Sequence, residues 1–276
     1  MPVSRSPSRN AKPSSHRDAR PVARSGTVWA VVLIGLAAVL AVVIGALPAA
    51  MIAHFLPASV QADDFSGSIW HGSVGRISVN ARDAGALEWQ LHPASLIRMS
   101  VAADLHWVKV GFVLDAAVKI DRQGFTAQAV KGGGPIEDLL DLGVAAGWRG
   151  TAEVNFSELK GDFTKPLAAV GDIRVSHVTA EQIAPGADLG SYDLALPEGA
   201  IGADGNVSAR ITDTGGPLEL QALIRYSANE HLGTLSGTLK ERPGAPPALL
   251  SQLENLVQLR GRDPQGRIPV DLEFAL

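Results

Sequence analysis

Histidine and carboxylate side chains are the groups of this chain that could carry chemistry, as metal ligands or as general acids and bases. No two of the seven histidines are two or four positions apart, so neighbouring residues supply no pair of metal ligands. A metal site with ligands from distant strands remains an alternative, but the local spacing predicts neither a metal nor another cofactor. The histidines are His16, His54, His71, His92, His106, His177 and His231.

Motifs for catalysis and phosphate binding are absent from the sequence. It contains no GxGxxG, GxxxxGK[ST], HExxH or GxSxG motif, and no cysteine to serve as a nucleophile or a thiolate ligand. Glu137 and Asp138 fall in the first turn of a predicted helix, where acids complement the helix dipole. Residues 132–135, three glycines and a proline, predict a flexible turn, because no Lys, Ser or Thr follows to bind an anion. We therefore expect no enzymatic activity; the alternative, a hydrolase, would need a polar constellation that the sequence does not show.

Strands are the elements that would have to position any site. Apolar and polar residues alternate with a period of two, which is typical of strands with one buried and one solvated face. The alternation is strict over 87–91, 114–120, 151–157, 218–226 and 268–274, and looser over 73–80, 101–110, 125–130, 173–178, 207–212 and 234–240. Turn-forming residues separate many of these runs, which favours an antiparallel sheet, a sandwich or an open barrel over βαβ units.

The predicted fold class is mainly β, with one N-terminal transmembrane helix and an antiparallel, twisted or curled sheet. This sheet is expected to be an open barrel or groove-like, with two short helices over 135–146 and 246–257. Pro269 cannot donate a ladder hydrogen bond. The last strand is therefore expected either to lie at a sheet edge or to have Pro269 among its first residues.

A basic segment, an apolar run and an acidic body follow one another along the chain. Residues 1–25 carry six Lys or Arg and one Asp, a net charge of +5. Because the whole chain carries −4, the remainder carries −9. An acidic body lacks the electrostatic footprint of a nucleic-acid-binding protein, so no nucleic-acid partner is expected.

Residues 26–47 contain no charge, and as a helix they would extend about 33 Å, enough to cross a hydrocarbon core of about 30 Å. A cleaved signal peptide is the alternative, but the length of the run favours an uncleaved anchor. Six Lys or Arg precede the run and neither occurs over 51–64, which directs the N-terminus to the cytoplasm. The predicted organisation is a disordered basic cytoplasmic tail (1–25), a single transmembrane helix in the cell inner membrane (26–50) and a periplasmic β domain (51–276).

Four sequence blocks occur in a fixed order after the apolar run. The first has Gly67, Trp70 and Gly72, the second has Leu87, Trp89 and Pro93, the third is Gly215-Gly216-Pro217, and the fourth begins at Gly266. We expect structural roles for them, with the glycines and Pro217 in turns and the tryptophans as large buried anchors. With the N-terminal span and the terminal strand, this order resembles the type II (general) secretion system protein N family over nearly everything after residue 25.

The resemblance implies a non-catalytic accessory component of the type II protein secretion apparatus, contributing to export of folded proteins across the outer membrane. Its partners would be the inner membrane and other secretion components, contacted through the surface or a strand edge of the β domain. The first two blocks are also similar to the openings of AsmA-type inner-membrane β proteins, which are associated with lipid handling. A lipid-handling β groove is therefore the alternative, because an apolar sheet face can be covered by side chains or by acyl chains.

Overall fold

The computed structural model describes residues 45, 47–142, 146–227 and 232–275, which belong to one unit, Gly45–Leu276. The predicted basic tail and residues 26–44 of the predicted span lie outside the described residues. Within the described ranges, no helix combines the length and the apolar character needed to cross a membrane.

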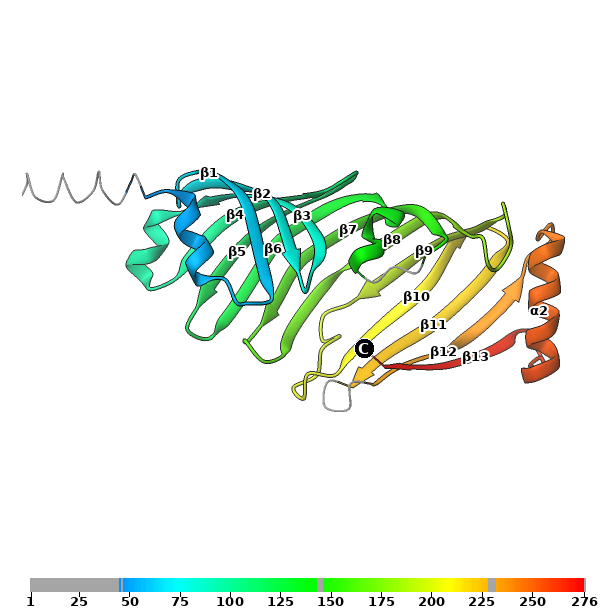
Figure 1. Cartoon of the computed structure of the whole chain (residues 1–276). Coiled ribbons are helices and arrows are strands. Elements are labelled where there is room, and N and C mark those ends of the chain that lie inside the picture. Colours follow the sequence, from blue (N-terminus) through cyan, green and yellow to red (C-terminus); the bar gives the residue numbers. More distant parts are fainter. Residues whose placement is uncertain (1–44, 46, 143–145, 228–231, 276) are drawn as a thin grey trace, which may run out of the picture. The chain divides into compact units, whose positions relative to one another are not determined.

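In the described part of the chain, thirteen strands form one antiparallel sheet, and each strand pairs with its neighbours in sequence (Figure 1). The first and last strands, β1 (Val60–Gly67) and β13 (Ile268–Ala275), are therefore the two edges. The strands between them are β2 (His71–Val79), β3 (Arg82–Leu91), β4 (Val101–Lys109), β5 (Phe112–Asp121), β6 (Gly124–Pro135), β7 (Trp148–Gly161), β8 (Pro166–Ala180), β9 (Asp188–Leu196), β10 (Val207–Gly215), β11 (Leu218–Ser227) and β12 (Leu232–Glu241). This open antiparallel sheet confirms the predicted fold class in its β part, and it places Pro269 on an edge strand as predicted.

Each run with predicted alternation falls on a strand, whereas β1 and β9 were not predicted. The predicted turn over 132–135 is wrong, because these residues continue β6 between β5 and β7. A Cβ on Gly132 would collide with the carbonyl oxygen of Val113. Glycine at this position therefore permits close approach of two strands instead of a change of direction.

Among the elements of residues 47–275 that the structure describes, four helical segments flank the sheet: η1 (Ala49–Phe55), η2 (Pro93–Arg98) and η3 (Ile136–Leu142) are 3-10 helices, and α2 (Pro247–Arg260) is an α-helix. The helix α2 confirms the prediction over 246–257 and begins with Pro247. The helix predicted from Pro135 is corrected: Pro135 still pairs with Thr151 at the end of β6, and the 3-10 helix η3 follows it. Residues 143–145 of the predicted range lie outside the described residues.

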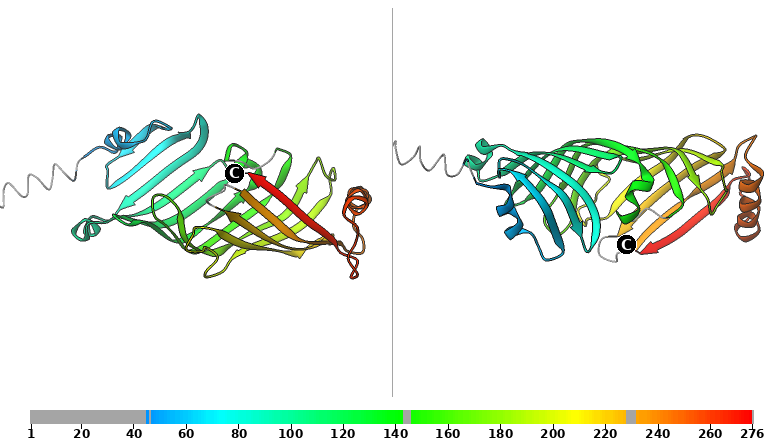
Figure 2. Two further views of the ribbon diagram at one scale, coloured as in Figure 1. Left: turned by 90° about the horizontal axis from the view of Figure 1, so that it is seen from below. Right: turned by 45° about the horizontal axis from the view of Figure 1, so that its top comes forward.

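The sheet curls, and its first strands fold back over the strands that follow them (Figures 1 and 2). Within the described residues, no second sheet covers the apolar inner face, so separate clusters of side chains fill it. One cluster packs α2 on the last strands, one packs η3 on β5 and β7, and one lies between β6, β7 and β8. Their buried members include Leu249, Leu253, Leu218 and Ile268, then Ile136, Phe112 and Ala152, and then Val130 and Phe156.

Candidate functional site

An apolar groove of about 260 Å³ lies inside the curl of the first five strands. It is closed on one side by η1 and lined by alternate residues of β1 to β5, because alternate residues of a strand point to the same face. Its lining is apolar throughout: Ile52, Leu56, Val60, Ala62, Phe65, Val74, Ile77, Leu87, Trp89, Leu91, Val101, Ala103, Leu105, Val118 and Ile120. The groove can therefore hold an apolar ligand and offers no group that could perform chemistry on it.

The first two sequence blocks meet in the wall of this groove. The indole N–H of Trp89 donates a hydrogen bond to the carbonyl oxygen of Ile69 (2.9 Å), and the Leu91 N–H donates to the carbonyl oxygen of Trp70 (2.7 Å). A Cβ on Gly72 would lie 2.5 Å from Cζ2 of Trp89, so glycine leaves the space that the indole occupies. Trp70 and Trp89 are half-buried, so the tryptophans hold the β1–β2 turn against β3 without being fully enclosed.

The remaining block residues lie at turns and element ends. Pro93 begins η2, and Gly67 has a φ of +79° at the end of β1, a backbone conformation that favours glycine. Gly215, Gly216 and Pro217 form the predicted turn between β10 and β11, where Gly216 lies against the backbone of Gly190. The structure therefore brings the first two blocks together beside the groove, which Leu87 and Trp89 of the second block line, and places the last two by the C-terminal strands.

The outer face of the same strands is polar, and it pairs histidines with aspartates. Nε2 of His92 lies 2.9 Å from Oδ2 of Asp104, and Nδ1 of His106 lies 2.6 Å from Oδ1 of Asp115. The two histidine side chains are 47% and 43% exposed, so solvent weakens both pairs. The sequence did not predict these pairs, because each joins residues of different strands whose register no local spacing reveals.

No metal centre is formed in the part of the chain that the structure describes, because no three His, Asp or Glu side chains there are grouped closely enough to hold an ion. One buried charge was also missed by the sequence analysis. Lys109 is 2% exposed, and its ammonium group donates a hydrogen bond to the carbonyl oxygen of Asp83. This contact satisfies the lysine within the fold and gives it a structural role.

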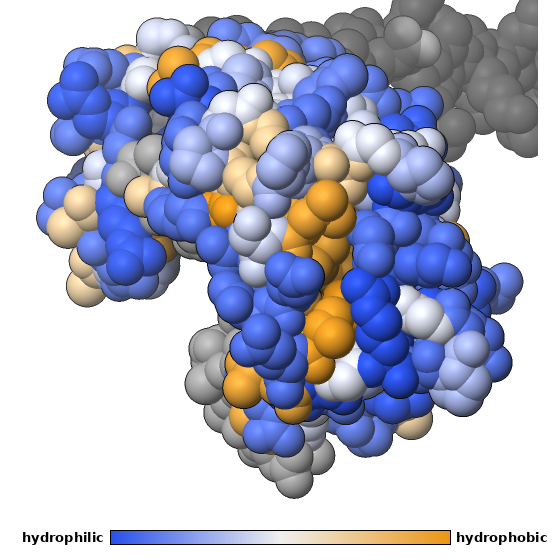
Figure 3. Space-filling view, turned by 90° about the vertical axis from the view of Figure 1, so that its right-hand side faces the viewer, coloured by the Kyte–Doolittle hydropathy of each residue, from blue (hydrophilic) through white to orange (hydrophobic). Residues whose placement is uncertain are grey.

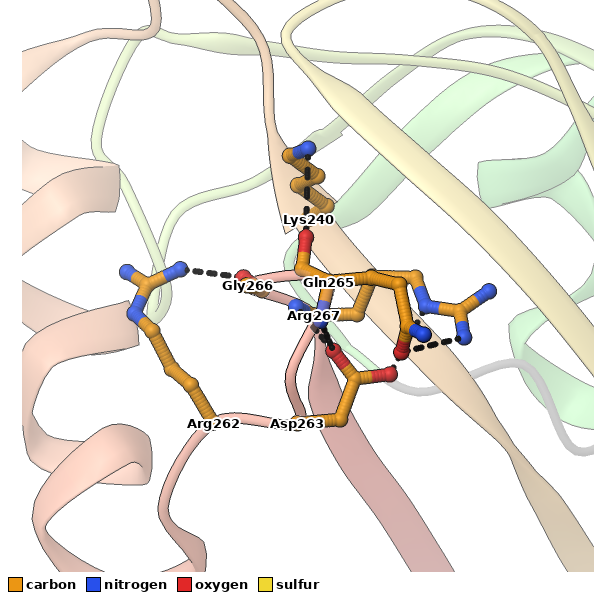
Figure 4. A network of polar contacts seen from close by, with 6 residues as sticks. All are labelled: Lys240, Arg262, Asp263, Gln265, Gly266 and Arg267. Atoms are coloured by element: carbon orange, nitrogen blue, oxygen red, sulfur yellow. Dashed lines mark hydrogen bonds and ion pairs between the residues drawn. The ribbon is translucent and has the colours of Figure 1, made fainter.

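A polar network fixes the chain where α2 leads into the edge strand β13 (Figure 4). Arg262 donates to both carboxylate oxygens of Glu241 (3.0 and 2.8 Å) and to the carbonyl oxygen of Gly266 (2.7 Å). Asp263 accepts hydrogen bonds from the backbone N–H and from Nε of Arg267 (both 2.8 Å). The fourth block thus forms the turn that sets the start of β13 against the end of β12.

Two carboxylates of this network have shifted acidities. The side-chain hydrogen bonds from Arg262 lower the pKa of Glu241 below its ordinary value of 4.5. Desolvation opposes the shift at Asp263, but hydrogen bonds from Arg267 and Gln265 outweigh it and lower the pKa of that carboxyl. Both groups therefore stay ionised at neutral pH and hold the turn.

The surface beside this turn is apolar. Leu250 and Leu259 of α2 are 40% and 81% exposed, and Leu272 of β13 is 56% exposed. Figure 3 shows an apolar stripe bordered by hydrophilic residues on the side of the molecule that carries α2. Arg260, the last residue of α2, donates to the carbonyl oxygen of Asp271 (3.1 Å), so the C-terminal end of the helix lies next to the first half of the edge strand. We name Leu250, Leu259 and Leu272, with the free edge of β13, the C-terminal edge surface.

Comparison with known proteins gives one finding. The model of a family described as type II secretion system (T2SS), protein N matches residues 58–271, well over half of the chain and a range that includes the first three sequence blocks and the fourth up to Asp271. No curated protein and no solved structure matches the chain.

Removal of the Trp89 indole should loosen the groove wall. We expect Trp89→Ala to lower the free energy of unfolding by about 3 kcal/mol, because it removes a large packed ring and leaves the Ile69 carbonyl without its donor. Trp89→Phe should cost about 1 kcal/mol, since it keeps much of the packing. Chemical denaturation measures both values, and an unchanged Trp89→Ala midpoint would contradict this role.

The Glu241–Arg262 pair should stabilise the fold in a pH-dependent manner. Since the folded-state pKa of Glu241 is lowered, the stabilisation is complete above pH 4.5 and is lost as the pH falls through the lowered value. We expect Glu241→Gln to lower the free energy of unfolding at neutral pH by about 0.5–1 kcal/mol, with the difference closing in acid. Urea titrations of the wild type and the variant at neutral pH and in acid test this, with Glu198→Gln on an exposed loop as the control. An equal difference in the free energy of unfolding under the two conditions would refute it.

Proposed function

Because this chain belongs to the type II secretion system protein N family, we propose that it is a non-catalytic accessory component of the type II secretion apparatus. Its apolar segment would anchor it in the cell inner membrane, with the N-terminus in the cytoplasm and the β domain in the periplasm. There it would contribute to export of folded proteins across the outer membrane through contact with other secretion components. The match over residues 58–271 is the observation that carries the proposal.

The C-terminal edge surface is the best-suited contact surface for such a partner. An edge strand can pair with a strand of another chain, and neighbouring apolar side chains add affinity. The other edge is less suited, because η1 packs beside β1, and Asp64 interrupts its pairing with a φ of +61°. The exposed apolar side chains beside its unpaired edge therefore favour β13 as the strand that contacts a partner.

The phase of β13 shows which of its backbone groups face outward. The carbonyl oxygen of Asp271 accepts a hydrogen bond from Arg260, which is outside the sheet. In an antiparallel strand the N–H and C=O of one residue point to the same side, and alternate residues point to opposite sides. Pro269, which has no N–H, lies two residues before Asp271 and Glu273 lies two residues after it. The backbone N–H and C=O of Glu273 therefore point to the free edge, whereas Leu272 pairs with Leu235 of β12.

A pair of proline variants separates partner contact from folding. We expect Glu273→Pro to fold normally and to reduce secretion of a folded substrate protein by about tenfold, because it removes an outward donor. Leu272→Pro should instead lower the melting temperature by several degrees, because it breaks a ladder bond. Secretion is measured as substrate in the medium against substrate retained in the periplasm, in cells that carry only the variant. Normal secretion with Glu273→Pro would refute contact through this edge, and normal secretion without the chain would refute the accessory role.

A lipid-handling groove is the second candidate, and the purely apolar lining of the groove favours it. A single alkyl chain would bury its surface against these side chains without leaving a polar group unpaired. No described polar side chain lines the groove to orient a head group, so the head group would stay outside.

Filling the groove should abolish lipid binding if this second candidate is correct. We expect Ala62→Trp to eliminate co-purifying phospholipid or lipopolysaccharide, detected by mass spectrometry after extraction of the purified full chain. Ala117→Trp is the matched control, because Ala117 is exposed on the outer, polar face of β5 and does not line the groove. Equal lipid in the two variants, or none in the wild type, would reject the lipid-handling groove.

A further inference from the structure

Large apolar side chains are exposed at one end of the sheet. Ile97 and Met99, in and just after η2, are 87% and 71% exposed, and Phe163 in the β7–β8 turn is 69% exposed. Leu96 and Phe125 are 47% and 40% exposed. We name these five residues the apolar rim. Surface leucines and valines scattered singly need no explanation, but a set of this size at one end of a sheet does.

The topology is what gathers these residues. Because consecutive strands are antiparallel, the connections from β3 to β4, from β5 to β6 and from β7 to β8 all lie at the same end of the sheet. Strands are spaced about 4.8 Å apart, so the rim from η2 to the β7–β8 turn spans roughly 20 Å. Figure 1 shows η2 and these turns on the same side of the sheet, at the left and lower ends of the strands.

The chain enters the sheet at this same end. The Ile69 N–H donates to the carbonyl oxygen of Leu47 (2.9 Å), and Pro48 forms a β-bridge with Ser68 in the β1–β2 turn. The Trp70 carbonyl of that turn binds the end of β3, and η2 follows two residues later. Leu47 is the last residue of the uncharged run 26–47. If that run spans a bilayer, covalent continuity leaves the β1–β2 turn and η2 at the bilayer surface.

The charges of the rim suit an interface between lipid and water. Arg98 ends η2, and Arg122 in the β5–β6 turn lies with a guanidinium nitrogen 3.5 Å from the sulfur of Met99. Long basic side chains beside apolar ones can reach lipid phosphates while their stems stay in the apolar layer. The acids of the turns are engaged locally: Asp121 accepts from the Gln123 N–H, and Asp162 accepts from Thr164 and Lys165. Hydrogen bonds from Thr164, then from Lys165, lower the pKa of Asp162.

We propose that the apolar rim docks onto the bilayer in which the chain is anchored, with Ile97, Met99 and Phe163 in the head-group and upper acyl region. The occupant is a lipid surface, because the exposed apolar residues, the flanking arginines and the chain entry occur at one end of the sheet. The orientation rests on the proposed inner-membrane anchor. Docking would fix the orientation of the β domain relative to the bilayer, whereas the N-terminal anchor alone would let it rotate.

Single-cysteine labelling tests the proposal directly, since the chain has no cysteine of its own. The full chain carrying Ile97→Cys, Met99→Cys or Phe163→Cys is labelled with an environment-sensitive fluorophore. It is then reconstituted into vesicles of phosphatidylethanolamine and phosphatidylglycerol with brominated acyl chains. We expect a blue-shifted emission and about twofold quenching at these positions. Val110→Cys is the matched control, because Val110 is 79% exposed in the β4–β5 turn at the opposite end, and its label should be unaffected.

Flotation of the vesicles separates this proposal from the anchor on which it rests. If the chain floats with the vesicles but the labels at 97 and 110 are both unquenched, rim docking is overturned and the anchor stands. If the two labels are quenched equally, rim docking is also overturned, because the domain then has no preferred end. A chain that does not float would overturn both. Thermal unfolding of each labelled variant confirms that the fold is retained.

Discussion

The apolar inner face of a long, open antiparallel sheet is the constraint on which the rest of this structure depends. In a sandwich, a second sheet covers such a face. Here every described strand belongs to one sheet. The curl of that sheet, the short helices and the larger side chains must therefore cover the apolar face. The curl encloses the first five strands, η3 packs on the middle of the sheet, and α2 packs on the ends of the last strands. The groove beside Trp89 is one part of that face that these elements leave open.

The meander topology separates the two ends of the sheet into different surfaces. At one end lie the chain entry, η2 and the turns of the apolar rim, while α2 and its Arg262–Glu241 pair lie at the other. The proposed membrane docking and the proposed partner contact therefore use different groups of residues. An accessory subunit built in this way could hold a partner at a set distance from the bilayer, because the strands between the two surfaces form a hydrogen-bonded sheet.

Much of the fold could be predicted from the sequence, because a half-buried strand imposes its period of two directly on the residue order. The runs at 114–120 and 218–226 show this, and both are strands. The turn predicted at the glycines 132–134 was wrong, since glycine allows both a turn and the close approach of two backbones, and only the neighbouring strands decide between them. A groove-like sheet was predicted, but the His106–Asp115 pair and the place of the groove between β1 and β5 could not be, because both depend on register and curl.

The size of the groove limits what a bound lipid could do. At about 260 Å³ it lies below the roughly 300–1,000 Å³ of small-molecule pockets, so it suits part of one acyl chain. Val101 and Ile120 line it and are 42% and 43% exposed at the end of the sheet that carries the rim, so the groove is open there. An acyl chain entering at this point would cover apolar surface that no described strand covers. Lipid binding and a scaffolding role are therefore compatible, because the lipid would serve as the missing part of the core.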